Sequence, residues 1–82
     1  MPRRSKNQIF AKILSICRGD GASKTKIVYQ ANLNFSKAGG YLDFLIRKGF
    51  LEVSSDILTI YRTTEKGETA LESLKAAEKI YS

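Results

Sequence analysis

The sequence predicts a single, mainly α-helical domain that contains one β-hairpin in its second half. Two changes of pattern predict this class. Up to Gly49, apolar side chains recur at the three- and four-residue spacing of amphipathic helices. Residues 50–63 instead contain two short runs rich in β-branched and aromatic side chains, and helical spacing returns after Thr64. A chain of 82 residues forms one domain with a thin core, because small domains bury a smaller share of their surface.

The first helix is expected over about residues 6–18. Ser5, with Gln8 three residues later, matches a capping box, in which side chain and backbone at a helix start bond each other reciprocally. Gly19 ends the helix, because glycine adopts the left-handed conformation at little cost. Cys17 belongs to the apolar stripe of this helix and is the one cysteine of the chain, so we expect a buried thiol and no internal disulfide.

Two further helices joined by a tight turn are expected next, which is the arrangement of a helix-turn-helix. Ser23 is the expected N-cap of the second helix, which ends near Ala31, and Asn32 is suited to a left-handed turn. The third helix is expected to run from residue 35 or 36 to Gly49. One of its faces is apolar, and the opposite face carries Ser36, Gly40, Asp43, Phe44 and Arg47.

The hairpin is expected from strands over residues 50–54 and 59–63, with a polar turn between them. Thr64 then offers an N-cap to a last helix, which covers residues 65–82. The full order of helix, helix, helix, hairpin and helix is that of a winged helix-turn-helix. Residues 1–82 are expected to form this one domain.

Positive charge is concentrated in the first part of the chain. The sequence holds 14 basic and 8 acidic residues, which gives a formal net charge of +6. Residues 1–50 carry ten basic and two acidic groups, whereas residues 51–82 carry four basic and six acidic groups. A basic surface attracts polyanions, so this distribution favours nucleic acid as the partner. The alternative for any single lysine is a solvated surface position.

Candidate phosphate contacts gather at the start of the second helix. Lys24, Thr25 and Lys26 lie where backbone amides and the helix dipole favour an anion, and the lysines add charge. Tyr29 projects away from the apolar side of the same helix. Its hydroxyl is expected either to reach a phosphate or to pack against another element.

The outward face of the third helix carries the candidates for base contacts. Lys37 and Arg47 lie near its two ends, and both side chains can bond guanine. Ser36 is expected either to hold a phosphate or only to cap the helix. Gly40 allows a close approach of DNA, the alternative being a tolerated weak point in the helix. The other candidates on this helix and at its end are Tyr41 and Lys48.

The hairpin and the N-terminus offer fewer cations. Arg62 is the one basic residue on the two strands, so deep insertion of a basic wing into the minor groove is not expected. Arg3, Arg4 and Lys6 are expected to reach DNA as a flexible N-terminal arm, the alternative being a disordered start.

Catalytic and membrane functions find no support in the sequence. The chain has no histidine and one cysteine, so neither a nucleophile–base pair nor a metal-ligand set is expected. We expect no enzyme, no cofactor, no metal and no small-molecule substrate. No apolar run reaches the roughly 18 residues of a membrane span, so a cytoplasmic, nucleoid-associated protein is expected.

Several short segments carry a resemblance to a known family. Residues Lys24-Thr25-Lys26-Ile27, Ala31-Asn32-Leu33 and Thr64-Glu65-Lys66-Gly67, in this order around a hairpin, resemble the small archaeal winged-helix DNA-binding proteins described as chromatin-associated or regulatory. The resemblance implies duplex DNA binding by a homodimer that pairs through C-terminal helices in an antiparallel coiled coil. Only 15 residues follow Gly67, so we expect a compact helical contact in place of a long coiled coil.

The last helix is the expected dimerisation element. Leu71, Leu74, Ala77 and Tyr81 fall on one stripe, which a small core is not expected to cover. Phe44 is also expected to face outward, where the hairpin or a partner subunit covers it. Pairing of two copies holds two recognition helices at a fixed separation.

Two hypotheses follow from these observations. The first is a homodimeric double-stranded DNA-binding protein that acts as a transcriptional regulator or a chromatin-associated protein. The second is a winged-helix module that binds another protein without specific DNA binding, because the same fold serves both uses. The basic charge of residues 1–50 favours DNA. RNA is a third and less favoured partner, since an aromatic sheet platform is lacking.

Overall fold

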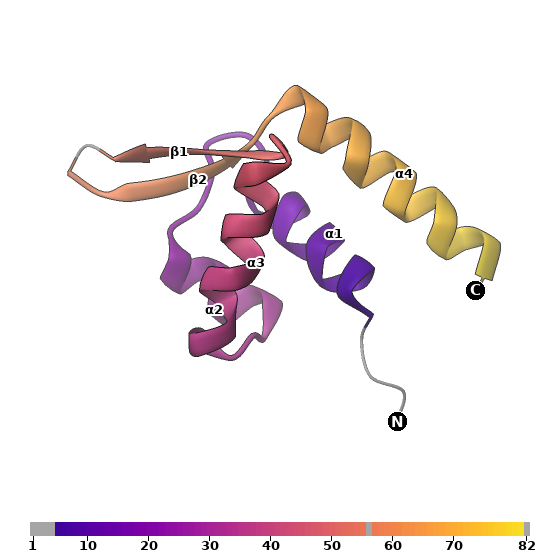
Figure 1. The fold of residues 1–82 in the computed structure, drawn as a ribbon, viewed down its shortest axis with the longest axis horizontal. Coiled ribbons are helices and arrows are strands. Elements are labelled where there is room, and N and C mark those ends of the chain that lie inside the picture. The colour runs from indigo at the N-terminus through magenta and orange to yellow at the C-terminus, as the bar shows by residue number, and fades with distance from the viewer. Residues whose placement is uncertain (1–4, 56, 82) are drawn as a thin grey trace.

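The predicted order of helices and hairpin is confirmed by the computed structural model, which describes residues 5–55 and 57–81, with side chains for residues 5–54 and 57–77 (Figure 1). The elements are α1 (Lys6–Ile16), α2 (Lys24–Ala31), α3 (Phe35–Arg47), β1 (Leu51–Ser55), β2 (Thr59–Thr63) and α4 (Glu65–Tyr81). In Figure 1, α1 lies between α3 and α4, the hairpin projects on the side of α2 and α3, and α4 runs off on the other side.

The capping box predicted for α1 is present. The Gln8 backbone N–H donates to the Ser5 hydroxyl at 3.1 Å, and the Ser5 N–H donates to the Gln8 side-chain oxygen at 2.8 Å. The helix ends two residues earlier than predicted, at Ile16 with Cys17 as C-cap. The reason is tertiary: the Cys17 carbonyl accepts the N–H of Thr63 at 3.0 Å, so the chain leaves the helix to meet β2.

The turn between α2 and α3 has the predicted form. Ser23 caps α2 by accepting the Lys26 N–H at 3.2 Å, and Asn32 has φ 54° and ψ 53°, which is the left-handed conformation. Asn34 is the N-cap of α3, and its side-chain oxygen accepts both the N–H of Ser36 at 2.9 Å and the Ser36 hydroxyl at 2.7 Å. The capping role considered for Ser36 therefore belongs to Asn34.

The hairpin is antiparallel, with Leu51 opposite Thr63 and Ser55 opposite Thr59. The segment before α2 extends this sheet by one bridge, because the N–H of Ala22 donates to the Tyr61 carbonyl and the N–H of Tyr61 donates to the Ala22 carbonyl, each at 2.8 Å. The buried Thr63 hydroxyl donates to the carbonyl of Leu14, in α1, at 2.6 Å. The base of the hairpin is thus fastened to the helices.

The core draws on every helix and on β1. Its largest fully buried side chains are Ile13, Leu14, Ile27, Leu42, Leu45 and Cys17, with Leu51 and Leu71 packed against them. Leu71 is 3% exposed, so the prediction that it belongs to an uncovered stripe of α4 is wrong. The physical reason is that the first half of α4 packs against α1 and closes the core of the same chain.

The start of α4 is tightly joined to the end of α3. The Thr64 hydroxyl donates to the carbonyl of Gly49 at 2.6 Å and accepts the N–H of Gly67 at 3.0 Å. Gly67 is buried, and a side chain there would collide with the carbonyl of Phe50 and the methyl group of Thr63. These contacts explain why threonine and glycine suit the first and last positions of the segment Thr64-Glu65-Lys66-Gly67.

Candidate nucleic-acid interface

The basic residues at the start of α2 do not form one cluster. The Lys24 ammonium lies 4.5 Å from the centre of the Phe35 ring, at the first turn of α3. Lys26 instead acts on the Cys17 thiol: burial raises the pKa of Cys17 to about 11, and the charge of Lys26 opposes part of that rise. The two lysines therefore lie on opposite sides of α2. Thr25, between them, is exposed.

Tyr29 is 85% exposed on α2. The alternative of packing against another element is therefore wrong, and its hydroxyl is accessible to a ligand. An exposed tyrosine near a helix-turn-helix turn can contact both a phosphate and the sugar beside it, since its ring is apolar and its tip is polar.

The outward face of α3 is open along its length. Ser36, Lys37, Gly40, Asp43 and Arg47 are all exposed, and we call them the α3 strip. A side chain added at Gly40 would meet no atom within 4 Å, whereas one at Gly39 would approach the Lys24 ammonium at 3.6 Å. Of the two glycines, Gly39 faces α2 and Gly40 faces open space.

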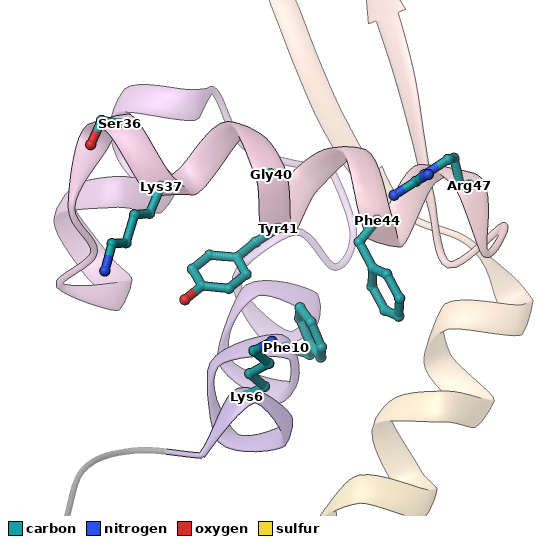
Figure 2. A pocket seen from close by; sticks show the side chains of 8 residues that line it. All are labelled: Lys6, Phe10, Ser36, Lys37, Gly40, Tyr41, Phe44 and Arg47. Carbon is teal, nitrogen blue, oxygen red and sulfur yellow. The ribbon is translucent and has the colours of Figure 1, made fainter.

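One flank of this strip is a groove shared with α1, which Figure 2 shows from close by. We call this open hollow of about 560 Å³ the α1–α3 groove; it is lined by Lys6, Phe10, Ser36, Lys37, Gly40, Tyr41, Phe44 and Arg47. The structure thus brings five of the predicted DNA-contacting residues together on one surface.

Aromatic rings form the floor of the α1–α3 groove. The rings of Phe10 and Phe44 stack with centres 4.9 Å apart and planes 13° apart, and Tyr41 meets the Phe10 ring edge-on at 5.8 Å. Phe44 is therefore covered by Phe10 of α1, and the prediction of cover by the hairpin or a partner subunit is wrong. In Figure 2 the Tyr41 hydroxyl points away from the rings, on the side of Lys37.

Cations surround this aromatic floor. Lys6, Lys37 and Arg47 line the groove, and the Lys48 ammonium lies 5.6 Å from the centre of the Phe44 ring. Lys6 was predicted from the sequence as part of a flexible N-terminal arm, but it lies in the first turn of α1. Phe10 was not identified as a site residue from the sequence. The sequence pattern around these two residues predicts only where α1 begins. It does not indicate that the first turns of α1 lie beside α3.

Near the base of the hairpin, one positive and one negative side chain lie on opposite strands. Arg62 lies directly opposite Glu52 in the strand register, and both side chains are exposed. Between the two strands, Ile57 is 98% and Leu58 70% exposed. Arg3 and Arg4 of the expected N-terminal arm lie outside the described residues.

The second half of α4 extends beyond the helices that form the core (Figure 1). Leu74 is half-buried in a second hollow of about 330 Å³, lined mainly by apolar side chains of α1, α3 and α4, which we call the α4 groove. Ala77 is exposed, and the side chain of Tyr81 lies outside the described residues. The Arg18 side chain forms an ion pair with Glu68 of α4, in which Nε and Oε1 are 3.1 Å apart.

Two chemical features bear on other functions. Among the described residues, no group of three or more histidine, cysteine, aspartate or glutamate side chains is placed to hold a metal ion. No helix in the described part of the chain is long and apolar enough to cross a membrane.

Comparisons with known proteins agree with this architecture. The family model described as winged helix-turn-helix matches residues 3–82. An uncharacterized protein of Methanocaldococcus jannaschii is 33% identical over 72 residues, which cover 88% of this chain and 71% of that protein.

Solved structures with the same fold include Sso10a-2, a DNA-binding protein from Sulfolobus solfataricus, with a TM-score of 0.85 and 30% identity over 96% of this chain and 82% of that one. A MarR family transcriptional regulator from Rhodococcus sp. RHA1 has a TM-score of 0.74 at 19% identity, over 83% of this chain and 51% of that one. These matches confirm the predicted fold and the resemblance to small archaeal winged-helix DNA-binding proteins.

Proposed function

Because this chain belongs to the winged helix-turn-helix family, we propose that it binds double-stranded DNA with α3 as the recognition helix. The α3 strip is the observation that carries the proposal: five exposed residues line one face of this helix, and the groove beside it is lined by three cations. The similarity to Sso10a-2, a DNA-binding protein, supports the same assignment. The protein then acts by binding, not by catalysis.

Each residue of the α3 strip has a chemical role in this proposal. Gly40 presents bare backbone at the middle of the strip, so the helix can approach the floor of the major groove closely. Lys37, in the first half of α3, is placed to reach guanine or a phosphate, and Arg47 lies near the other end. Asp43 adds an acceptor, which suits the amino group of cytosine.

Residues around the strip are proposed to contact the DNA backbone. Thr25 and Tyr29 are exposed on α2, next to α3 in the helix-turn-helix. Lys6 and Lys37 both line the α1–α3 groove, and we propose that one sugar–phosphate strand runs between them. Lys24 is held by the Phe35 ring, so it contributes charge at the junction of α2 and α3.

A salt series tests this proposal. Binding to one duplex is measured at several salt concentrations for the wild type, for Lys37→Ala and for Lys75→Ala, a control on α4, which runs off on the side away from α2 and α3. We expect the logarithm of the wild-type binding constant to fall steeply with the logarithm of salt, by about 0.9 per phosphate contacted. Lys37→Ala is expected to weaken binding, while the control is expected to bind like the wild type. A flat salt dependence of the wild type contradicts the proposal.

We further propose that the protein is a homodimer with a regulatory or chromatin-associated role, paired through α4. The α4 groove is apolar, and Leu74 at its edge together with the exposed Ala77 leaves an uncovered strip on the outer half of that helix. Leu71 has no part in this contact, because it is buried in its own chain.

A further inference from the structure

The floor of the α1–α3 groove is more apolar than contact with a sugar–phosphate strand requires. Its three aromatic side chains, Phe10, Tyr41 and Phe44, are only partly buried, and all of them line the groove. Phosphate oxygens bind to cations and to N–H or O–H donors, so they gain nothing from an aromatic floor. The floor therefore fits a ligand that has flat apolar parts as well as negative charges.

Tyr41 is the ring best placed to receive a flat group. It lies one helical turn after Lys37 on the same side of α3, and Figure 2 shows its ring between α3 and the start of α1. Its contact with Phe10 is edge-on, with an angle of 80° between the ring planes. Such a contact occupies at most one face of the Tyr41 ring, so the other face is not lost to Phe10.

The rim of the same groove is positively charged. Lys6, Lys37 and Arg47 line it, and the described residues that line it include no aspartate or glutamate. The groove has a volume of about 560 Å³, which lies within the range of pockets that hold organic ligands. Aromatic faces inside a cationic rim are the combination with which proteins bind unpaired nucleic-acid strands.

Base pairing decides which form of DNA can use these rings. In a duplex each base is stacked between its neighbours, and only its edges can be reached from the grooves. A protein reaches the face of a base only where the strand is unpaired or the base is turned out of the stack. A duplex on α3 therefore leaves the aromatic floor without a partner, whereas a single strand can cover it.

We propose that the α1–α3 groove is a binding site for single-stranded DNA, in which one base stacks on Tyr41 and the adjoining phosphates lie against the cations of the rim. The choice of DNA over RNA rests on the duplex binding proposed above, while the stacking itself does not. Lys37 and Arg47 belong to both the groove and the α3 strip. A single strand and a duplex therefore compete for the protein.

The first test uses the wild-type protein and two labelled strands of equal length. Oligothymidylate is compared with an abasic strand, which has the same phosphates and no bases, and binding is followed by fluorescence anisotropy over a salt series. We expect oligothymidylate to bind about tenfold more tightly, because stacking adds to its affinity. The two salt slopes are expected to be equal, since both strands release the same counterions. Equal affinity for the two strands overturns the proposal.

Two substitutions at Tyr41 then locate the stacking. Tyr41→Leu keeps an apolar side chain beside Phe10 but removes the ring, so the tenfold preference for oligothymidylate is expected to disappear. Tyr41→Phe keeps the ring and is expected to retain the preference. Thermal unfolding shows whether both variants are folded. If folded Tyr41→Leu keeps the preference, the base stacks elsewhere and the proposal is wrong.

Further outcomes separate this site from the proposed function. A wild type that binds duplex DNA with a steep salt slope, but does not distinguish oligothymidylate from the abasic strand, overturns the single-strand site alone. A wild type that prefers oligothymidylate and binds no duplex overturns the proposed function and supports the groove site. An oligouridylate RNA that binds more tightly than oligothymidylate overturns the choice of DNA. Unlabelled duplex is expected to displace oligothymidylate, and simultaneous binding of both contradicts the shared site.

Discussion

At the scale of single residues, the α3 strip combines a carboxylate with two cations. Asp43 is exposed between Lys37 and Arg47, on a surface proposed to face phosphates and bases. A carboxylate there repels the DNA backbone unless it accepts a hydrogen bond from a base. We therefore expect Asp43 to contribute more to discrimination between DNA sequences than to affinity.

Asp43→Asn tests that role. We expect binding to random duplexes to become tighter, because one repulsive charge is removed, while the ratio between the preferred site and random DNA falls. Competition titrations with both kinds of duplex measure this ratio. An unchanged ratio means that Asp43 does not contact a base.

The Cys17 thiol affects stability at high pH. Burial raises its pKa from 9.0 to about 11, with Lys26 opposing part of the rise. Below pH 9 the thiol is protonated in the folded and the unfolded chain alike. Between pH 9 and 11 the unfolded chain releases this proton and the folded chain keeps it, so the free energy of unfolding falls with rising pH, by about 2 to 3 kcal/mol in total.

Urea unfolding of the wild type and of Cys17→Ala at pH 8 and pH 11 isolates the contribution of the thiol, because every other side chain is the same in the two proteins. The pH-dependent loss is expected to be smaller in Cys17→Ala. Equal losses in the two proteins would show that the thiol does not contribute.

At the scale of the elements, two helical glycines have opposite roles. Gly67 in α4 has no room for a side chain, because the carbonyl of Phe50 occupies the space. Gly67→Ala is therefore expected to lower the free energy of unfolding by about 1 to 3 kcal/mol, even though alanine favours helix. Thermal and urea unfolding measure the change.

Gly40→Ala is the matched substitution in α3, where the added methyl group meets open space. It is expected to raise the free energy of unfolding by about 0.5 to 1 kcal/mol. The same variant is expected to bind duplex DNA less tightly, because the methyl group keeps α3 away from the groove floor. Higher stability with unchanged DNA affinity would remove Gly40 from the interface.

Local sequence signals predicted the elements well. The capping box at Ser5, the left-handed Asn32 and the return of helical spacing after Thr64 are chemical features of a few neighbouring residues. The early end of α1 was not predictable in this way, because its cause is a hydrogen bond between Cys17 and Thr63. Asn34 was overlooked as the cap of α3 although its hydrogen bonds to Ser36 span only two residues, so a local signal was present there.

The candidate site was predictable only in part. A helical wheel identified the outward residues of α3, because exposure on one helix follows its period. The approach of Lys6 and Phe10 to α3, and the burial of Leu71 against α1, depend on how separate helices pack. The periodicity of one segment does not contain that information.

At the scale of the whole molecule, the proposed dimer brings two recognition helices to the DNA. Ala77→Glu places a charge on the exposed outer half of α4, where it does not disturb the core, and Leu74→Glu places one at the α4 groove. Both are expected to yield monomers of 9.2 kDa and to weaken DNA binding, although neither changes a DNA-contacting residue.

Sedimentation at micromolar concentration measures this, with Ala76→Glu as the matched control, since Ala76 is exposed on the same helix one residue away. The control is expected to remain dimeric. A wild-type protein that sediments as a monomer refutes the dimer, and a dimer that tolerates both Leu74→Glu and Ala77→Glu places the interface elsewhere.

The tight joint between α3 and α4 has a consequence for the choice of binding site. Thr64 and Gly67 hold the start of α4 against the turn after α3, so the angle between the two helices has little freedom. In the proposed dimer the two recognition helices then keep a set rotational phase. One inserted base pair turns the second half-site by about 35° around the duplex, since a turn spans about 10 base pairs. Tolerance of such insertions measures the torsional stiffness of the joint.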